Sequence, residues 1–348
     1  MKKNIAFITI LTMVFFIITA IIINIKNPIK KENGEKIEII ATLFPQYDFA
    51  KQIGGDKVNV KLLLPPGSES HTYEPTPQDM LMINESDLFV YTGKEMEPWA
   101  ENLISGMKKD INVIDLSKSV ELIHSEEFEE EHMEENDEHE HEHEYEHNHN
   151  HDEGEHNHEY DPHIWLNPQN AIKMAKNIEK ELINIDPDNA EYYKNNAEKY
   201  INEIAKLDKE IEQTVNSSSN PKIAFGGAFA YAYFIERYNI DFISAYETCG
   251  EGSEPSTVQV KEVIDYINNN NLPVIFYKEY TSGNVAQTIS EATGAKMLVF
   301  NTVHNISKDE INNGATYVSI MKENLENLKQ ALKWNIWGRS FFVSILKH

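Results

Sequence analysis

The sequence predicts an α/β protein of two lobes, each with a mainly parallel β-sheet flanked by helices, joined by one long rigid helix. Three observations support this fold class. Short apolar runs typical of strands alternate with helical segments up to about residue 120, and the alternation returns after residue 220. A long amphipathic helical pattern lies between the two halves. Strands that alternate with helices are typical of parallel βαβ units, so each half predicts its own sheet.

The first half contains four runs with strand character, at residues 37–41, 58–64, 88–91 and 113–116. A helix is expected over residues 76–85, because Thr76 suits the N-cap, Pro77 the first helical position and Asp79 the first turn. Another helix is expected to end at the Gly54–Gly55 pair, directly before the second strand.

Two further helices are expected in the middle of the chain. The first covers residues 168–182 with Asn167 as its N-cap. The second starts at Pro187, runs for about 29 residues and is about 43 Å long at 1.5 Å per residue. A surface helix of a single domain is one interpretation, but this length favours a rigid connection between two lobes.

The second half repeats the pattern of the first. Strands are expected at residues 222–225, 242–245, 273–277 and 296–300, and helices at 228–238, 256–269 and 284–293. The predicted division is a signal anchor or signal peptide at 1–26, a tether at 27–36, an N-terminal lobe at 37–186 with a disordered His/Glu-rich loop at 124–160, a linking helix at 187–215, a C-terminal lobe at 216–332 and an unassigned tail at 333–348.

Residues 126–159 have a composition that cannot form a core. They contain nine histidines, seventeen Asp or Glu, and no Lys or Arg. Imidazole and carboxylate groups are ligands for divalent metals, zinc above all, so we interpret the segment as a low-affinity metal scavenger rather than as a solvated acidic linker. The expected scavenging residues are His139, His141, His143, His147, His149, His151, His156 and His158.

The composition of the chain as a whole limits its partners and its location. Its 348 residues carry a net charge of −26 and no basic patch, which argues against nucleic acid as a partner. The apolar run at residues 5–25 follows Lys2 and Lys3 and predicts an uncleaved membrane anchor, with a cleaved signal peptide as the alternative. Because no cysteine lies near this run, we do not expect a lipoprotein. The only cysteine, Cys249, excludes an intramolecular disulfide and a Cys-based zinc cluster.

Three histidines outside the acidic segment are candidate metal ligands. His71 lies in a loop after the second expected strand, and His304 follows the last one. His163 lies in the motif DPHIWLNP, where Pro162 stiffens the backbone and Trp165 is expected to pack against the ring. Since ligands of open α/β sheets bind at the carboxyl ends of strands, one site shared by the two lobes is expected.

Several motifs resemble the zinc/manganese solute-binding proteins of ABC transporters. These motifs are PPGSESHTYEPTPQD, DPHIWLNP, ISAYETCGEGSEPS, PVIFYKEYTSGNVAQTISEATGAK and YVSIMKENLENLKQAL, and the resemblance covers residues 37–332. It implies a metal ion in the cleft between the lobes and delivery of that ion to a permease in the membrane. It also implies that His71, His163 and His304 are ligands.

The resemblance breaks down at two positions of the expected site. Gly226 stands where the family has a third ligand, His or Glu, and Lys278 stands where it usually has Glu. The open candidates for a fourth ligand are Glu69, Glu247 and Cys249. Three imidazoles suit zinc, whereas manganese sites favour more carboxylate, so zinc is favoured over manganese.

The resulting expectation is a monomeric extracytoplasmic zinc receptor at the cell surface, not an enzyme. A manganese receptor of the same family is one alternative. A zinc-dependent hydrolase is a second, since three histidines and an open position also describe catalytic zinc, but the chain has no HExxH helix and no GxSxG turn. A passive surface metal buffer is a third.

Overall fold

The computed structural model describes residues 35–68, 70–107, 111–128, 159–246 and 255–345. It contains two four-stranded sheets, ordered β2-β1-β3-β4 and β6-β5-β7-β8, with every neighbouring pair parallel. The strands are β1 (Ile37–Ala41), β2 (Val58–Leu62), β3 (Leu88–Tyr91), β4 (Asn112–Asp115), β5 (Lys222–Phe225), β6 (Asp241–Ser244), β7 (Val274–Tyr277) and β8 (Lys296–Val299). The predicted two-lobed α/β class is confirmed, and each expected strand exists with ends shifted by no more than two residues.

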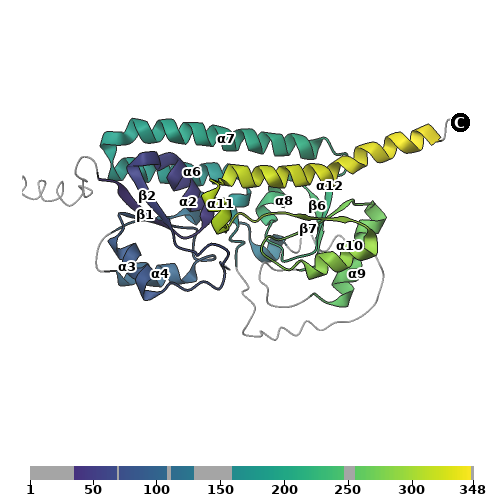
Figure 1. Ribbon diagram of the computed structural model, residues 1–348, viewed down its shortest axis with the longest axis horizontal. Helices are drawn as coiled ribbons and strands as arrows, with labels where there is room; N and C mark the ends of the chain where they lie inside the picture. The colour runs from purple at the N-terminus through teal and green to yellow at the C-terminus, as the bar shows by residue number, and fades with distance from the viewer. Residues whose placement is uncertain (1–34, 69, 108–110, 129–158, 247–254, 346–348) are drawn as a thin grey trace, which may run out of the picture.

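Helices cover both faces of each sheet (Figure 1). On one side lie α2 (Phe44–Gly54), α6 (Pro168–Ile185), α7 (Ala190–Asn216), α8 (Ala232–Tyr238) and α12 (Tyr317–Ile345). On the other side, α3 (Pro77–Glu85) and α4 (Pro98–Gly106) cover the first sheet, and α9 (Thr257–Asn270) and α10 (Asn284–Thr293) cover the second. The short α11 (Lys308–Asn312) precedes α12.

Local sequence explains where several of these helices begin. Thr76 accepts a hydrogen bond from the backbone N–H of Asp79, and the Asp79 side chain bonds back to the backbone of Thr76, which confirms the predicted start of α3. Asn167 caps α6 as expected by accepting from Gln169 N–H. Helix α8, in contrast, starts four residues later than predicted, because residues 226–231 after β5 form a loop.

The main hydrophobic core is continuous between the lobes. It includes Phe49 of α2, Ile204 of α7, Phe225 of β5 and Leu325 of α12, each at most 2% exposed. Helix α7 is the predicted long helix and runs along both lobes, and α12 lies beside it from the junction of the lobes across the second lobe (Figure 1). A shared core opposes relative motion of the lobes, because opening them would expose apolar surface to water.

A polar network also ties α7 to both lobes. The Asp208 carboxylate of α7 accepts from Gln169 Nε2 of α6 at 2.6 Å, and from Arg237 Nη2 and Tyr238 Oη of α8 at 2.8 Å each. Asp208 is only 5% exposed, so these charge-assisted bonds fix α6 and α8 to the same point on α7.

The predicted membrane anchor at residues 5–25 lies outside the described residues. Among the helices that the structure describes, none is both long enough and apolar enough to span a bilayer. Of the predicted disordered loop 124–160, residues 129–158 also lie outside the described part, and their disorder stays a prediction. The two ends of this loop are described and pair, with Ser125 N–H donating to Glu159 O at 3.1 Å.

Glu97 is a buried carboxyl at the carboxyl ends of β1 and β3. It is 3% exposed and accepts from Thr42 Oγ1 at 2.5 Å and from the N–H groups of Thr92 and Gly93 at 3.1 Å each. Burial raises the pKa of Glu97 from 4.5 to about 7, although these donors act in the opposite direction.

A raised pKa makes the folded protein bind more protons than the unfolded chain between pH 4.5 and about 7. Tighter proton binding by Glu97 in the folded state stabilises that state. The contribution is complete below pH 4.5 and is lost as the pH rises through about 7. We expect its loss to lower the free energy of unfolding by about 3 kcal/mol across that window. Urea unfolding at several pH values should show a smaller decline for Glu97→Gln, which cannot titrate. Equal slopes for the two proteins would contradict the assignment.

Candidate functional site

The structure brings His71, His163 and His304 together between the lobes. The ring centroids of His71 and His163 are 5.3 Å apart, and that of His304 lies 6.3 Å from His71 and 6.4 Å from His163. His71 belongs to the loop after β2, and His163 directly precedes the 3₁₀ turn Ile164–Leu166. His304 comes from the other lobe, in the loop after β8.

These spacings can be compared with those of a tetrahedral zinc site. Two imidazoles on one ion with Zn–N bonds of about 2.0–2.1 Å have ring centroids about 5 Å apart. His71 and His163 already have this separation, whereas His304 must approach them by about 1 Å. In agreement with this gap, no group of three or more His, Cys, Asp or Glu within the described ranges has metal-holding geometry as it stands.

His163 has the environment of a metal ligand. Its ring is fully buried, and Nδ1 lies 3.1 Å from Asp161 Oδ1, which also accepts from the backbone N–H of His163 at 2.7 Å. The Asp161 carboxylate therefore holds the ring proton on Nδ1. The other nitrogen, Nε2, is buried and has no hydrogen-bond partner among the described residues. A buried lone pair without a partner is costly unless a ligand satisfies it.

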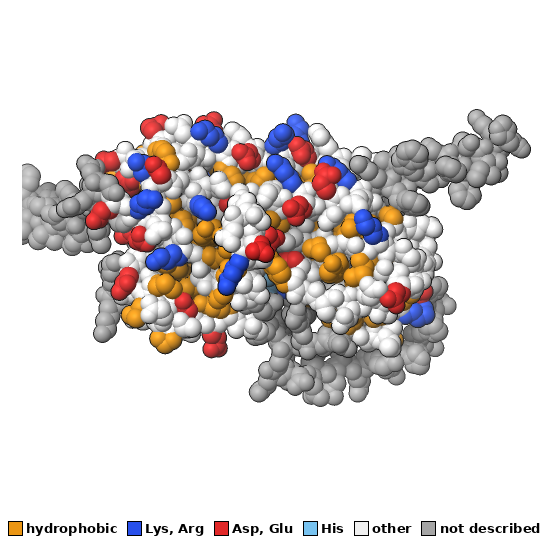
Figure 2. Space-filling view, in the orientation of Figure 1, with side chains coloured by type: hydrophobic (Ala, Val, Ile, Leu, Met, Phe, Trp, Pro, Cys, Tyr) orange, Lys and Arg blue, Asp and Glu red, His pale blue; other side chains and the backbone are white. Residues whose placement is uncertain are grey.

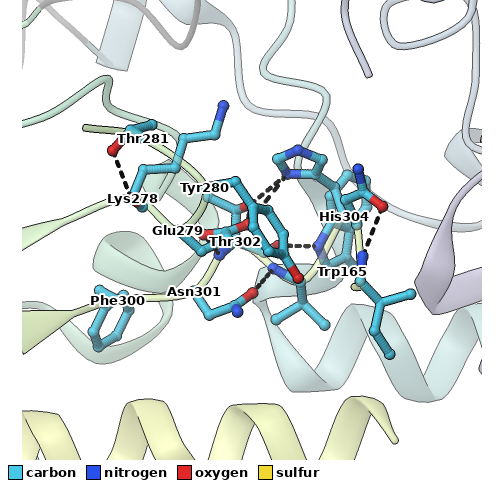
Figure 3. A network of polar contacts seen from close by, with 12 residues as sticks. Trp165, Lys278, Glu279, Tyr280, Thr281, Phe300, Asn301, Thr302 and His304 are labelled. Carbon is cyan, nitrogen blue, oxygen red and sulfur yellow. Dashed lines mark hydrogen bonds and ion pairs between the residues drawn. The ribbon is translucent and has the colours of Figure 1, made fainter. Parts of the chain in front are cut away.

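His304 is oriented by a chain of polar groups within its own lobe (Figure 3). The Thr302 hydroxyl donates to Glu279 Oε1 at 2.5 Å. The Thr302 oxygen, Oγ1, also forms a hydrogen bond with His304 Nδ1. A hydroxyl that donates to Glu279 accepts from the ring, which places the proton of His304 on Nδ1. Nε2 is then the nitrogen that can ligate.

Two buried ionisable residues, Lys278 and Glu279, lie near His304. Burial lowers the pKa of His304 well below its usual value, and the positive charge of Lys278 acts in the same direction. The neutral form of the ring, the one that binds metals, is therefore favoured. Burial raises the pKa of Glu279, whose carboxylate lies 3.9 Å from His304 Nδ1 and accepts from Thr302 N–H at 2.8 Å.

Gly226 cannot be replaced by a ligating side chain without rearrangement. A Cβ atom at this position would lie 2.7 Å from Ala286 Cα and 2.8 Å from Ala286 Cβ in α10. The absence of a side chain is therefore required by the close approach of the loop after β5 to α10. The departure from the family pattern at Gly226 leaves three imidazoles at the site.

Several predicted site residues lie outside the described part of the chain. These are the fourth-ligand candidates Glu69, Glu247 and Cys249, and all eight scavenging histidines from His139 to His158. The expected packing of Trp165 on His163 is confirmed, with ring centroids 5.6 Å apart.

Sequence reasoning missed the residues that orient the histidines. Asp161 was identifiable, since an acidic residue two positions before a histidine in a Pro-stiffened turn is a candidate partner for its ring. Thr302 and Glu279 are 23 residues apart and carry no local signal. The sequence pointed to Lys278, but it is the carboxylate of the neighbouring Glu279 that bonds to Thr302 in the His304 loop.

Comparisons with known proteins agree with this geometry. The family model of ZnuA, the periplasmic component A of a zinc-uptake complex, matches residues 39–331. The high-affinity zinc uptake system protein ZnuA of Bacillus subtilis is 35% identical over 300 residues, covering 86% of this chain and 88% of that protein. The zinc-binding lipoprotein AdcA of Streptococcus pneumoniae is 31% identical over 86% of this chain, which spans only 57% of AdcA.

Solved structures show the same architecture. The Zn(II)-bound ZnuA-like domain of S. pneumoniae AdcA superposes with a TM-score of 0.68 at 28% identity, covering 85% of this chain and 99% of that domain. By sequence, the manganese ABC transporter substrate-binding lipoprotein PsaA of Streptococcus anginosus is also similar, at 27% identity over 86% of this chain and 90% of that protein. With most of its length matched by the family model and by a relative above 30% identity, the chain belongs to the ZnuA family of zinc-uptake receptors.

Proposed function

We propose that this protein captures Zn²⁺ outside the cytoplasm between its two lobes and delivers it to an ABC-type permease in the membrane. His71, His163 and His304 are the proposed ligands. The buried Nε2 of His163, which has no hydrogen-bond partner among the described residues while Nδ1 contacts Asp161, is the observation that supports this proposal most directly. Binding draws His304 toward the other two rings by about 1 Å, and a water molecule or another oxygen ligand completes a tetrahedron.

The ligand set favours zinc over manganese. All three proposed ligands are imidazoles. Among the described carboxylates, that of Asp161 contacts His163 Nδ1 and that of Glu279 accepts from the Thr302 hydroxyl. Manganese sites favour carboxylate oxygen ligands, and none of the three proposed ligands is a carboxylate. Membership of a receptor family also argues against the hydrolase alternative.

We further propose that the histidine-rich segment scavenges zinc weakly and raises its concentration near the cleft. The ends of the segment suggest where to remove it. Phe128 is buried and stacks on Phe229 and Phe242 at centroid distances of 6.0 and 5.9 Å. A deletion should therefore begin after Phe128 and remove residues 129–158, with a short linker in their place.

Zinc titration of the protein with and without residues 129–158 tests the division of labour. We expect both forms to hold one tightly bound zinc ion, and the full chain alone to bind additional zinc weakly. Loss of all tight binding on deletion would show that the protein is a metal buffer rather than a cleft receptor. Weak sites that persist after deletion would contradict the scavenging role.

A further inference from the structure

The loop that carries His304 is bonded to the opposite lobe at several points. Trp165 Nε1, next to the His163 turn, donates to Thr302 O at 2.7 Å. The N–H of Phe44, at the start of α2, donates to His304 O at 3.2 Å. The backbone on either side of the proposed ligand is therefore fixed to the N-terminal lobe.

Asn305 adds a direct link between the His304 loop and the His71 loop. Its side chain is 1% exposed. Its Oδ1 accepts from Gly67 N–H at 3.3 Å and from Ile306 N–H at 2.7 Å, and its Nδ2 donates to Ser68 O. The Asn305 carboxamide thus bonds through both its oxygen and its nitrogen to the adjacent residues Gly67 and Ser68 of the opposite lobe.

The segment that Asn305 contacts is a stiff turn. Ser68 N–H donates to Pro65 O at 3.0 Å, and Gly67 has φ +80°, a value that Gly adopts without strain. Pro65 and Pro66 restrict the backbone before it. The turn lies three residues before His71, so fixing Ser68 also restricts where His71 can lie.

The backbone next to His304 is strained. Val303 has φ +63°, which is unusual for a β-branched residue, and its side chain is fully buried. Such a conformation persists only where the surrounding structure enforces it. Asn301 Oδ1 accepts from Val303 N–H at 2.7 Å on one side, and Asn305 holds the chain on the other.

We propose that Asn305 is a positioning residue that sets the separation of His71 and His304 and thereby the selectivity of the site for zinc. The inference rests on the proposed zinc-receptor function and adds a residue that touches no metal. Loss of the Asn305 carboxamide removes its bonds to Gly67 and Ser68 of the His71 loop, and it leaves the strained segment around Val303 freer to relax.

The test compares Asn305→Ala with Asn327→Ala in the full chain. Asn327 is a matched control, because its Nδ2 donates to a backbone carbonyl, Val299 O, at 2.8 Å within one lobe. We expect Asn305→Ala to weaken Zn²⁺ binding about ten- to a hundredfold, as is typical of residues that orient metal ligands, and to reduce the preference for Zn²⁺ over Mn²⁺. The visible d–d spectrum of bound Co²⁺ should change in Asn305→Ala and stay unchanged in Asn327→Ala.

A second variant keeps the inference testable if Asn305→Ala does not fold. Asn305→Asp retains an acceptor for Gly67 and Ile306, but it places a carboxylate oxygen against Ser68 O where the amide donor stood, so a loss of affinity comparable to that of Asn305→Ala is expected. Wild-type affinity and an unchanged Co²⁺ spectrum in the folded Asn305 variant, or an equal loss in Asn327→Ala, would overturn the positioning role alone. A wild-type protein without tight zinc binding would overturn the receptor function and this inference with it.

Discussion

Replacing His163 with alanine should abolish tight zinc binding while leaving the protein folded. Zinc sites in small domains have apparent binding free energies of about 10–16 kcal/mol, so one ligand of four corresponds to about 2.5–4 kcal/mol. That is a loss of affinity of roughly a hundred- to a thousandfold. Competition with a fluorescent zinc chelator measures it directly.

His124 provides the matched control for this experiment. It lies at the base of the histidine-rich segment, where its ring contacts Tyr160 at a centroid distance of 5.3 Å. His124→Ala removes the same group from outside the proposed site, and zinc affinity should stay at the wild-type value. Tight binding that survives His163→Ala, or falls equally in both variants, would rule out the three-histidine site.

The second large effect is expected at Asp48, which joins three helices in the shared core. Its Oδ2 accepts from Tyr200 Oη of α7 and from Tyr317 N–H of α12 at 2.8 Å, and its Oδ1 accepts from Gln52 Nε2 at 3.0 Å. Asp48→Ala leaves two buried donors without an acceptor. At about 1–3 kcal/mol for each, we expect the free energy of unfolding to fall by about 2–6 kcal/mol in urea denaturation.

The Asp48→Asn variant distinguishes the contribution of the hydrogen bonds to stability from that of the negative charge. An asparagine oxygen in the place of Oδ2 still accepts from Tyr200 and Tyr317, and Gln52 can turn its amide to accept from the new donor. Because burial raises the pKa of Asp48, loss of the charge also removes a cost of desolvation. We expect this variant to be close to wild type in stability. A loss as large as that of Asp48→Ala would show that the negative charge itself stabilises the interface.

Much of the fold could be predicted from local patterns. Burial of both sheet faces made the strands short apolar runs, as in Ile37–Ala41, and capping residues such as Thr76 and Asn167 marked where helices begin. The second long helix, α12, was not among the helices predicted from the sequence. Its role depends on packing beside α7, and periodicity within one segment does not reveal its neighbour.

The ligands of the candidate site could also be predicted from the sequence, whereas the residues that orient them could not. Three histidines near the carboxyl ends of predicted strands, or in a Pro-stiffened motif, were enough to name His71, His163 and His304. The partners of their rings were not evident, since Glu279 and Thr302 meet only through the pairing of β7 with β8 and the turn that follows. The residue that links the two ligand loops, Asn305, bonds to a turn more than two hundred residues earlier in the chain.

The sequence by itself therefore determined the fold class, the ligand-bearing segments and the missing side chain at Gly226, because periodicity, capping and motif identity are local properties. Only the tertiary structure decided how far apart the three imidazoles lie, which nitrogen of His163 and His304 is available, and why no side chain fits at Gly226. These properties depend on contacts between residues distant in sequence. The physical reason is that such contacts form only when the two lobes pack around one shared core, which no segment of the chain encodes alone.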